Sequence, residues 1–244
     1  MTQTFSLYPA IDLRFGQVVC LKQGDAAQQT IYDDNPASRA RLWMESGAAW
    51  LHVVNLDGAF DADQSTNEKA IQAICAVAKA YPTKIQLGGG IRSLAAIEKA
   101  LCLGVTRVIM GTAAVENPQL LEEALSIYGK DALALGLDAR DGYLQTHGWV
   151  TQTKIRAIDL ACEWVAKWLK WVIFTDIARD GVGTGINLSA TQTLVQASAC
   201  SVIAPLVCVV KRMYCKRVIS AVRVSLLDAP CMMGCSHSKG FSRC

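Results

Sequence analysis

The chain has 244 residues, of which 52% are apolar and 18% charged, and 24 basic against 21 acidic side chains give a net charge of +3. This apolar content can bury a sizeable core, which excludes a mainly disordered chain. The sequence holds no basic run and no apolar run long enough for a membrane span, so we expect binding to neither nucleic acid nor membrane. Residues 1–8 lack the basic and apolar parts of a signal peptide, and we therefore expect a cytoplasmic protein.

Short apolar segments alternate with helical patterns along most of the chain. The predicted strands are, in chain order, residues 7–13, 50–56, 84–87, 107–110, 133–137 and 171–175. The predicted helices between them are residues 37–45, 67–80, 94–103, 118–128 and 157–169. Strands that are apolar on both faces, each followed by a helix, indicate an α/β fold with a parallel sheet covered by helices.

The size of the chain selects between two α/β architectures. The six predicted strand–helix units leave room for two more, which gives a (β/α)8 TIM barrel of the usual size, about 250 residues. A doubly wound sheet would carry a Gly-x-Gly-x-x-Gly turn after its first strand, and that turn is absent. We therefore predict a single barrel domain over residues 1–244.

An internal repeat indicates that the barrel consists of two half-barrels. The segment Ala10-Ile11-Asp12-Leu13-Arg14-Phe15-Gly16 lines up with Gly136-Leu137-Asp138-Ala139-Arg140-Asp141-Gly142, so that Asp, Arg and Gly recur at one spacing. The following strands, residues 50–55 and 171–176, also correspond. Because chemistry in such barrels lies at the carboxyl ends of the strands, the repeat predicts Asp12 and Asp138 on opposite sides of one mouth.

Three acidic residues are candidates for general acid–base chemistry. Asp12 and Asp138 each follow an apolar strand, where a carboxylate is costly unless it faces a polar mouth. The structural alternative for each is a helix cap or a salt bridge with the nearby Arg14 or Arg140. The recurrence of the pair favours function, since two facing carboxyl groups in different environments suit acid–base work. Asp180 is the third candidate, in the polar, glycine-rich loop that begins at Thr175.

Two glycine-rich turns predict a phosphate cradle. Gly88-Gly89-Gly90-Ile91-Arg92-Ser93 and Met110-Gly111-Thr112-Ala113 each follow a strand and open a helix, where backbone N–H groups can approach an anion. Either turn alone could be a plain strand–helix connection, and no Gly-Lys-Ser/Thr follows, so this is not a Walker loop. Trp149, in His147-Gly148-Trp149, could stack on a flat ring of a ligand or simply pack inside its loop.

The histidines and cysteines do not predict a metal site. His52 lies within an apolar strand and is interpreted as a core residue, while His147 has no evident partner. Six of the ten cysteines fall in residues 200–244, but the spacing Cys231-x3-Cys235-x-His237 lacks the paired Cys-x-x-Cys of a zinc site. The other four cysteines lie in apolar segments, as buried free thiols do.

The sequence resembles one family over residues 7–193, the ProFAR isomerases (phosphoribosylformimino-5-aminoimidazole carboxamide ribotide isomerases) of histidine biosynthesis. The resemblance rests on Pro9-Ala10-Ile11-Asp12-Leu13, Gln23-Gly24-Asp25, Leu87-Gly88-Gly89-Gly90-Ile91-Arg92-Ser93, His147-Gly148-Trp149 and Thr175-Asp176-Ile177-Ala178-Arg179-Asp180-Gly181. It implies an Amadori rearrangement of an aminoaldose to an aminoketose, with no metal or organic cofactor. The implied partner is a small-molecule substrate with two phosphates, and we expect a monomer.

The resemblance also implies roles for individual residues. Asp12 matches the general base at the sugar C2, and the acid that opens the ring matches either Asp138 or Asp180. Thr175 matches a residue that hydrogen-bonds near the ring oxygen, and Trp149 matches an aromatic that stacks on the imidazole. Two positions depart from the family: Cys20 stands where Arg is usual, and Asn55 where Asp is usual.

The tail, residues 205–244, departs most from the family, because the Gly-Gly and Gly-Arg-Ala turns expected after Ala204 are missing. The tail can be read in a second frame, in which each new codon joins the third base of one codon to the first two bases of the next. In this frame the segment from Leu206 can encode Gly-Val-Arg-Ser and, further on, Asp-Val-Leu. In the same frame, Leu227 to Gly234 can encode Gly-Arg-Ala-Leu-Tyr-Asp-Gly. We therefore predict a one-base slip near residues 200–206 and two aberrant final strand–helix units; the alternative is a divergent natural tail.

Three other functions stay open at this stage. The sister cyclase barrel of the same pathway also has paired Asp residues and phosphate turns, but the segment Leu21-Lys22-Gln23-Gly24-Asp25 and the missing strand-5 lysine speak against it. A dual isomerase that also serves tryptophan synthesis is not separated by these motifs. The chain could also be an inactive remnant that binds phosphate with its first half-barrel.

Overall fold

The computed structural model describes residues 6–182, 185–207 and 224–229 of the chain. One sheet of 12 strands forms its centre. Four of these strands pair antiparallel in two hairpins, and the remaining eight run parallel to one another. The predicted α/β class with a parallel sheet is thus confirmed.

The parallel strands pair in a closed ring, which is the strand arrangement of a TIM barrel. In ring order they are β1 (Leu7–Arg14), β4 (Trp50–Asn55), β5 (Lys84–Gly88), β6 (Arg107–Met110), β7 (Leu133–Arg140), β10 (Trp171–Asp176), β11 (Ser201–Val207) and β12 (Val224–Ala229). Strand β12 closes the ring by pairing with β11 on one side and β1 on the other. The two segments that follow β11 and β12, residues 208–223 and 230–244, lie outside the described residues, so the predicted aberrant units stay a prediction.

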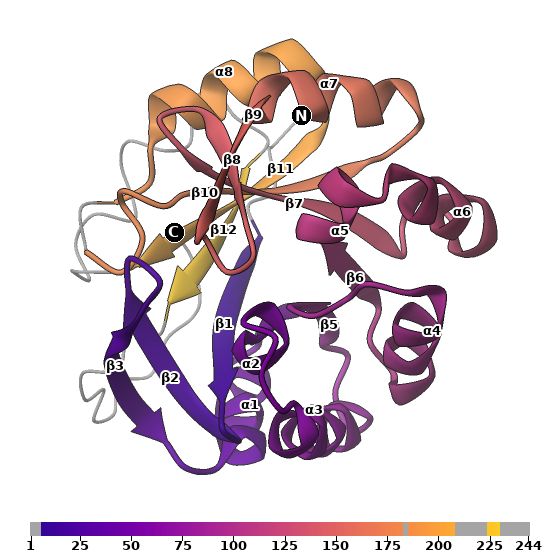
Figure 1. Cartoon of the computed structure of the whole chain (residues 1–244). Helices are drawn as coiled ribbons and strands as arrows, with labels where there is room; N and C mark the ends of the chain where they lie inside the picture. The colour runs from indigo at the N-terminus through magenta and orange to yellow at the C-terminus, as the bar shows by residue number, and fades with distance from the viewer. Residues whose placement is uncertain (1–5, 183–184, 208–223, 230–244) are drawn as a thin grey trace.

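Helices surround the strands (Figure 1). They are α1 (Pro36–Glu45), α3 (Ser65–Ala78), α4 (Leu94–Leu103), α6 (Pro118–Tyr128), α7 (Ala157–Ala166) and α8 (Leu188–Ser198), with two short helices at strand ends, α2 (Leu56–Ala59) and α5 (Thr112–Glu116). All five predicted helices are present, while α2, α5 and α8 were not predicted. Several helices begin as the sequence suggests: Ser93 and Asn117 accept hydrogen bonds from the backbone N–H groups of the first turn. Among the described residues, no helix is both long and apolar enough to cross a membrane.

Two antiparallel hairpins follow the first and fifth strands of the ring. After β1 come β2 (Gln17–Lys22) and β3 (Asp25–Asp33), and after β7 come β8 (Tyr143–Thr146) and β9 (Thr151–Arg156). Their first turns share one register, since Arg14 pairs with Gln17 as Arg140 pairs with Tyr143. The sequence patterns missed both hairpins because β3 and β9 are largely exposed and polar.

The end of the ring where the parallel strands begin is filled by an aromatic and cationic plug. The Arg107 side chain is 2% exposed, and its guanidinium lies 4.4 Å from the Trp50 ring centroid and 3.8 Å from that of Trp171. Tyr8 stacks on Trp50 at 5.4 Å. All four residues lie at or near strand starts, so a ligand-sized space remains at the opposite end, where the strands finish.

Candidate functional site

A cavity of about 230 Å³ lies at the carboxyl ends of the parallel strands. Every site residue predicted from the sequence lines it: Asp12, Gly89, Gly90, Arg92, Gly111, Thr112, Asp138, Trp149, Thr175 and Asp180. Ala10, His52, Ile109 and Ile173 form part of its wall. The structure therefore brings the predicted residues of the strand ends and loops to one place.

Asp12 and Asp138 face the cavity from opposite sides of the ring. Asp12 is on β1 and Asp138 on β7, and three parallel strands separate β1 from β7 in either direction. Burial raises the pKa of Asp12 to about 7, and the charge of Asp180 adds to this shift. Burial likewise raises the pKa of Asp180 to about 7, with a further contribution from Asp138. Low solvent access and neighbouring negative charge both favour the protonated carboxyl group.

Asp138 has two hydrogen-bond partners that set it apart from the other acids. Burial raises its pKa, while hydrogen bonds from Trp149 and Thr175 lower it. Thr175 is 7% exposed and sits directly beside Asp138 in the register of β10 and β7. These donors stabilise the ionised form of Asp138, because a carboxylate accepts hydrogen bonds more strongly than a carboxylic acid does.

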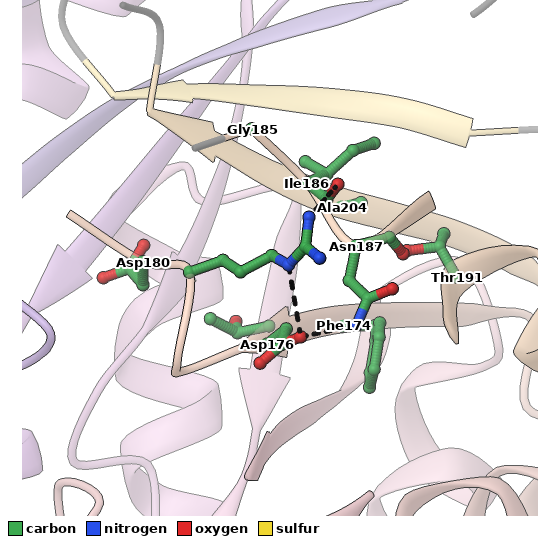
Figure 2. A pocket seen from close by; sticks show the side chains of 10 residues that line it. Phe174, Asp176, Asp180, Gly185, Ile186, Asn187, Thr191 and Ala204 are labelled. Atoms are coloured by element: carbon green, nitrogen blue, oxygen red, sulfur yellow. Dashed lines mark hydrogen bonds and ion pairs between the residues drawn. The ribbon is translucent and has the colours of Figure 1, made fainter. Parts of the chain in front are cut away.

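The loop after β10 carries Asp180 to the rim of the cavity. Its neighbour Arg179 turns to a separate small pocket, where the guanidinium donates to the Ile186 carbonyl at 3.5 Å and lies 4.0 Å from the Asp176 carboxylate (Figure 2). Asn187 donates to the same carboxylate at 2.7 Å. Arg179 is thus engaged with Asp176, which leaves the adjacent Asp180 without that cation as a partner.

The same loop docks on the turn between β2 and β3. The Gln23 backbone N–H donates to the Asp180 carbonyl at 3.2 Å, and the Gln23 side chain donates to the Ala178 carbonyl at 3.1 Å. Gly181 lies so close that a Cβ there would meet the Leu21 carbonyl oxygen at 2.5 Å. These contacts position Asp180 beside the hairpin that carries Cys20.

The first glycine turn has a backbone that only glycine can supply. Gly89 has φ +92°, and a Cβ on it would lie 2.1 Å from the Asn55 carbonyl oxygen. Asn55 in turn accepts hydrogen bonds from the Gly58 N–H and the Asn67 side chain, so its amide supports the turn from behind. Arg92 follows the turn and forms an ion pair with Asp61.

Several residues at the cavity were not recognised from the sequence. Gly24 and Phe60 line it beside Trp149 and Gly148.

His147, interpreted from sequence as lacking a partner, lies 2.7 Å from Glu116, which corrects that interpretation. The signal was hidden because the two residues are 31 positions apart on different elements.

Two residues interpreted as buried also line the cavity. Cys20 contributes to the wall, and burial followed by the charges of Asp12 and Asp180 raises the pKa of its thiol to about 11. His52 is 8% exposed, and its Nδ1 lies 2.7 Å from the side-chain nitrogen of Gln86, which donates a hydrogen bond to it. Burial lowers the pKa of His52 to about 4. His52 is therefore neutral at pH 7, as expected of a core histidine. Over the described part of the chain, no cluster of His, Cys, Asp or Glu could hold a metal ion.

Comparison with known proteins gives a consistent match over most of the chain. A family described as histidine biosynthesis protein matches residues 6–205. Proteins named 1-(5-phosphoribosyl)-5-((5-phosphoribosylamino)methylideneamino) imidazole-4-carboxamide isomerase are similar to it in several bacteria. The protein of Granulibacter bethesdensis is 46% identical over 82% of this chain and 81% of its own length. The proteins of Rhizorhabdus wittichii and Cupriavidus necator are 47% and 48% identical over 81% of this chain and 79% of their own.

We predict that removing the Asp12 carboxyl stabilises the folded protein at neutral and alkaline pH. The unfolded chain loses this proton near pH 3.8 and the folded protein near pH 7, so the penalty of burying the charge grows between those values. Asp12→Asn should therefore raise Tm by about 3 °C or more at pH 8 and leave it unchanged near pH 4. Thermal unfolding at both values measures this.

The exposed Asp141, in the turn between β7 and β8, provides the matched control, since Asp141→Asn makes the same chemical change in solvent. An equal Tm shift at the two pH values for Asp12→Asn would contradict burial of its charge.

Proposed function

Because the chain belongs to the histidine biosynthesis protein family, we propose that it catalyses the aldose–ketose isomerisation for which its relatives are named. The substrate is the phosphoribosylformimino aminoimidazole carboxamide ribotide, and the product is its phosphoribulosyl form. The observation that carries the proposal is the set of three carboxyl groups around one cavity, two of them on opposite sides of the ring. An Amadori rearrangement needs a base and an acid on opposite sides of one sugar.

Asp12 is the general base in this proposal. It takes the proton from C2 of the ribosyl group after the ring opens. The electron pair of the broken C2–H bond forms a C1=C2 double bond, and the π pair of the protonated Schiff base moves onto its nitrogen to give an enolamine. A pKa of about 7 keeps a substantial fraction ionised at neutral pH while making the carboxylate more basic than an ordinary one.

We assign Asp180 as the general acid that protonates the ring oxygen. Its pKa of about 7 leaves it partly protonated at neutral pH, as an acid must be. Asp138 instead accepts hydrogen bonds from Trp149 and Thr175, which favour its ionised form. We infer that Asp138 and Thr175 orient the sugar near the ring oxygen, and that the negative charge of Asp138 keeps Asp180 protonated.

The two glycine turns supply a site for one substrate phosphate. Backbone N–H groups around Gly89, Gly90 and Gly111 can approach an anion closely, and the Thr112 hydroxyl can donate to a phosphate oxygen. Arg92 adds a positive charge beside this turn once it exchanges Asp61 for the phosphate. Trp149 covers the imidazole part of the substrate by stacking.

The barrel is built from two equivalent halves in this proposal. The first half contains β1, β4, β5 and β6, and the second β7, β10, β11 and β12. The common register of the two hairpins supports the duplication, since the paired residues Arg14 and Gln17 have counterparts 126 positions later. Asp12 and Asp138 are then equivalent positions that have taken different roles.

The tail, residues 205–244, is in this proposal a misread continuation of the family sequence. The family match ends at residue 205, and about a fifth of the length of the relatives lies outside the matched part. A one-base slip near residues 200–206 accounts for both facts and for the missing glycine turns. Those turns would hold the second phosphate, so their loss removes half of the phosphate binding.

The remaining features of the proposal follow from the reaction. The isomerisation needs no metal or organic cofactor, and we infer a monomer in the cytoplasm, since all the site residues named above belong to one chain. The names of the relatives favour the isomerase over the sister cyclase and over a phosphate-binding remnant. The dual isomerase also serves tryptophan synthesis, and turnover assays with a substrate from each pathway distinguish it.

We predict that the three carboxyl groups contribute unequally to catalysis. With the tail restored to the family's frame, Asp12→Asn and Asp180→Asn should each lower kcat by about 10²–10⁴-fold with little change in KM. Asp138→Asn should have a smaller effect, because it orients the reactants. Steady-state kinetics on the isomerase substrate measure this, with Asp141→Asn as the control.

Wild-type turnover in Asp12→Asn would refute its role as the base. A full loss in Asp138→Asn together with near-normal turnover in Asp180→Asn would move the acid to Asp138.

We also predict that the tail limits this chain as it stands. Expressed beside a version with the reading frame restored, it should melt at a lower temperature and show little isomerase turnover, because the second phosphate has no cradle. Thermal unfolding and turnover of the two proteins, side by side, measure this. Equal Tm and equal turnover would mean that the tail is native.

A further inference from the structure

The loop between β8 and β9 holds an unusual backbone conformation. His147, Gly148 and Trp149 have φ values of +53°, +64° and +72°, three consecutive residues in the left-handed region. Glycine adopts this region readily, but histidine and especially tryptophan do so at a cost. Such strain persists only where surrounding contacts hold it, and it gathers at functional sites.

Two contacts hold the first residue of this segment to α5. The His147 backbone N–H donates to the Thr112 hydroxyl at 3.1 Å, and the His147 ring Nε2 lies 2.7 Å from the Glu116 carboxylate. Thr112 and Glu116 are the two ends of α5, one helical turn apart. One short helix therefore fixes both the backbone and the side chain of His147.

Contacts at the other end of the segment place the indole over the cavity. A Cβ on Gly148 would lie 2.5 Å from the Phe60 ring, so the backbone packs directly on that ring. A Cβ on Gly24 would lie 2.2 Å from the Trp149 indole, so the indole covers this glycine of the opposite hairpin. The Trp149 side chain also lies near enough to Asp138 to lower the pKa of that carboxyl group. The indole thus spans from one hairpin to the other beside a candidate acid.

We propose that Glu116 and His147 are positioning residues whose side-chain contact, anchored on α5, holds the Trp149 indole across the cavity. Neither residue touches the cavity, and both act through the strained backbone between them and the indole. The consequence for turnover rests on the proposed function, since it takes the indole to contact the substrate. The position of the indole itself is a property of the free protein.

The protein offers a closely matched control for this pair. Lys167 and Glu122 form an ion pair of the same length, 2.7 Å, on the outer surface, where Lys167 also pairs with Glu163. The Glu122 and Glu116 side chains are 50% and 49% exposed. Replacing either glutamate therefore removes the same group from the same degree of solvent exposure, but only Glu116 is connected to Trp149.

Acrylamide quenching of Trp149 fluorescence in the free protein tests the proposal. The chain has six tryptophans, so the Trp149 contribution is the difference between each variant and the same variant carrying Trp149→Phe. Glu116→Ala should raise the quenching of Trp149 by about twofold or more. Without the Glu116 carboxylate the β8–β9 loop is held less firmly, and the indole becomes more accessible to acrylamide. Glu116→Gln should retain wild-type quenching, because its amide oxygen still accepts from His147. Glu122→Ala should also match wild type.

Kinetics in the frame-restored protein provide the second readout. Glu116→Ala should raise KM by about 3- to 10-fold with kcat unchanged. This is expected because the indole contact stabilises the bound substrate and the transition state equally, so that its loss weakens binding alone. A purely structural role would instead lower Tm and the active fraction, and so kcat, without raising KM. Equal quenching in Glu116→Ala and Glu122→Ala would overturn the proposal. Because quenching needs no turnover, the positioning role can stand even if the isomerase function fails.

Discussion

The crowding of three partly buried carboxyl groups around one cavity is the constraint on which the site depends. Asp12, Asp138 and Asp180 meet there, and among the described residues Arg92 is the one Lys or Arg side chain that lines the same space. Arg92 is already paired with Asp61. The negative charges therefore compete, and protonation is the least costly way to accommodate them. This is why acids that ordinarily ionise near pH 4 hold their protons to about pH 7 here.

The fold supplies the geometry that makes this crowding useful. A closed ring of parallel strands brings distant strand ends to one rim, and a plug of Arg107 between two tryptophans fills the other end. The two hairpins then cover part of the rim, one carrying Cys20 and Gly24, the other Trp149. Hydrogen bonds from Trp149 and Thr175 make Asp138 different from its neighbours. Asp12 and Asp138 thereby face one cavity from opposite sides with different neighbours, as the proposed acid–base reaction needs.

Much of the framework could be predicted from the sequence. The six predicted strands and five predicted helices were placed to within a few residues, because those strands are apolar on both faces and signals such as Asn117-Pro118 mark helix starts. Strands β11 and β12 of the ring were not among the predicted strands. The candidate site residues lie together because parallel strands end at a common edge. The hairpins were missed because β3 shows neither an apolar face nor an alternating pattern. The His147–Glu116 pair could not be found by spacing, since only the folded chain brings α5 beside the β8–β9 loop.

The proposed acid–base roles of Asp12 and Asp180 depend on these carboxyl groups holding protons near neutral pH. Infrared difference spectra, wild type minus Asp12→Asn, isolate the C=O stretch of the protonated Asp12 carboxyl as pH is raised in the free protein. We predict that this band persists at pH 5 and disappears around pH 7, where the group titrates. A band already lost by about pH 5, close to the ordinary titration of Asp, would contradict the account.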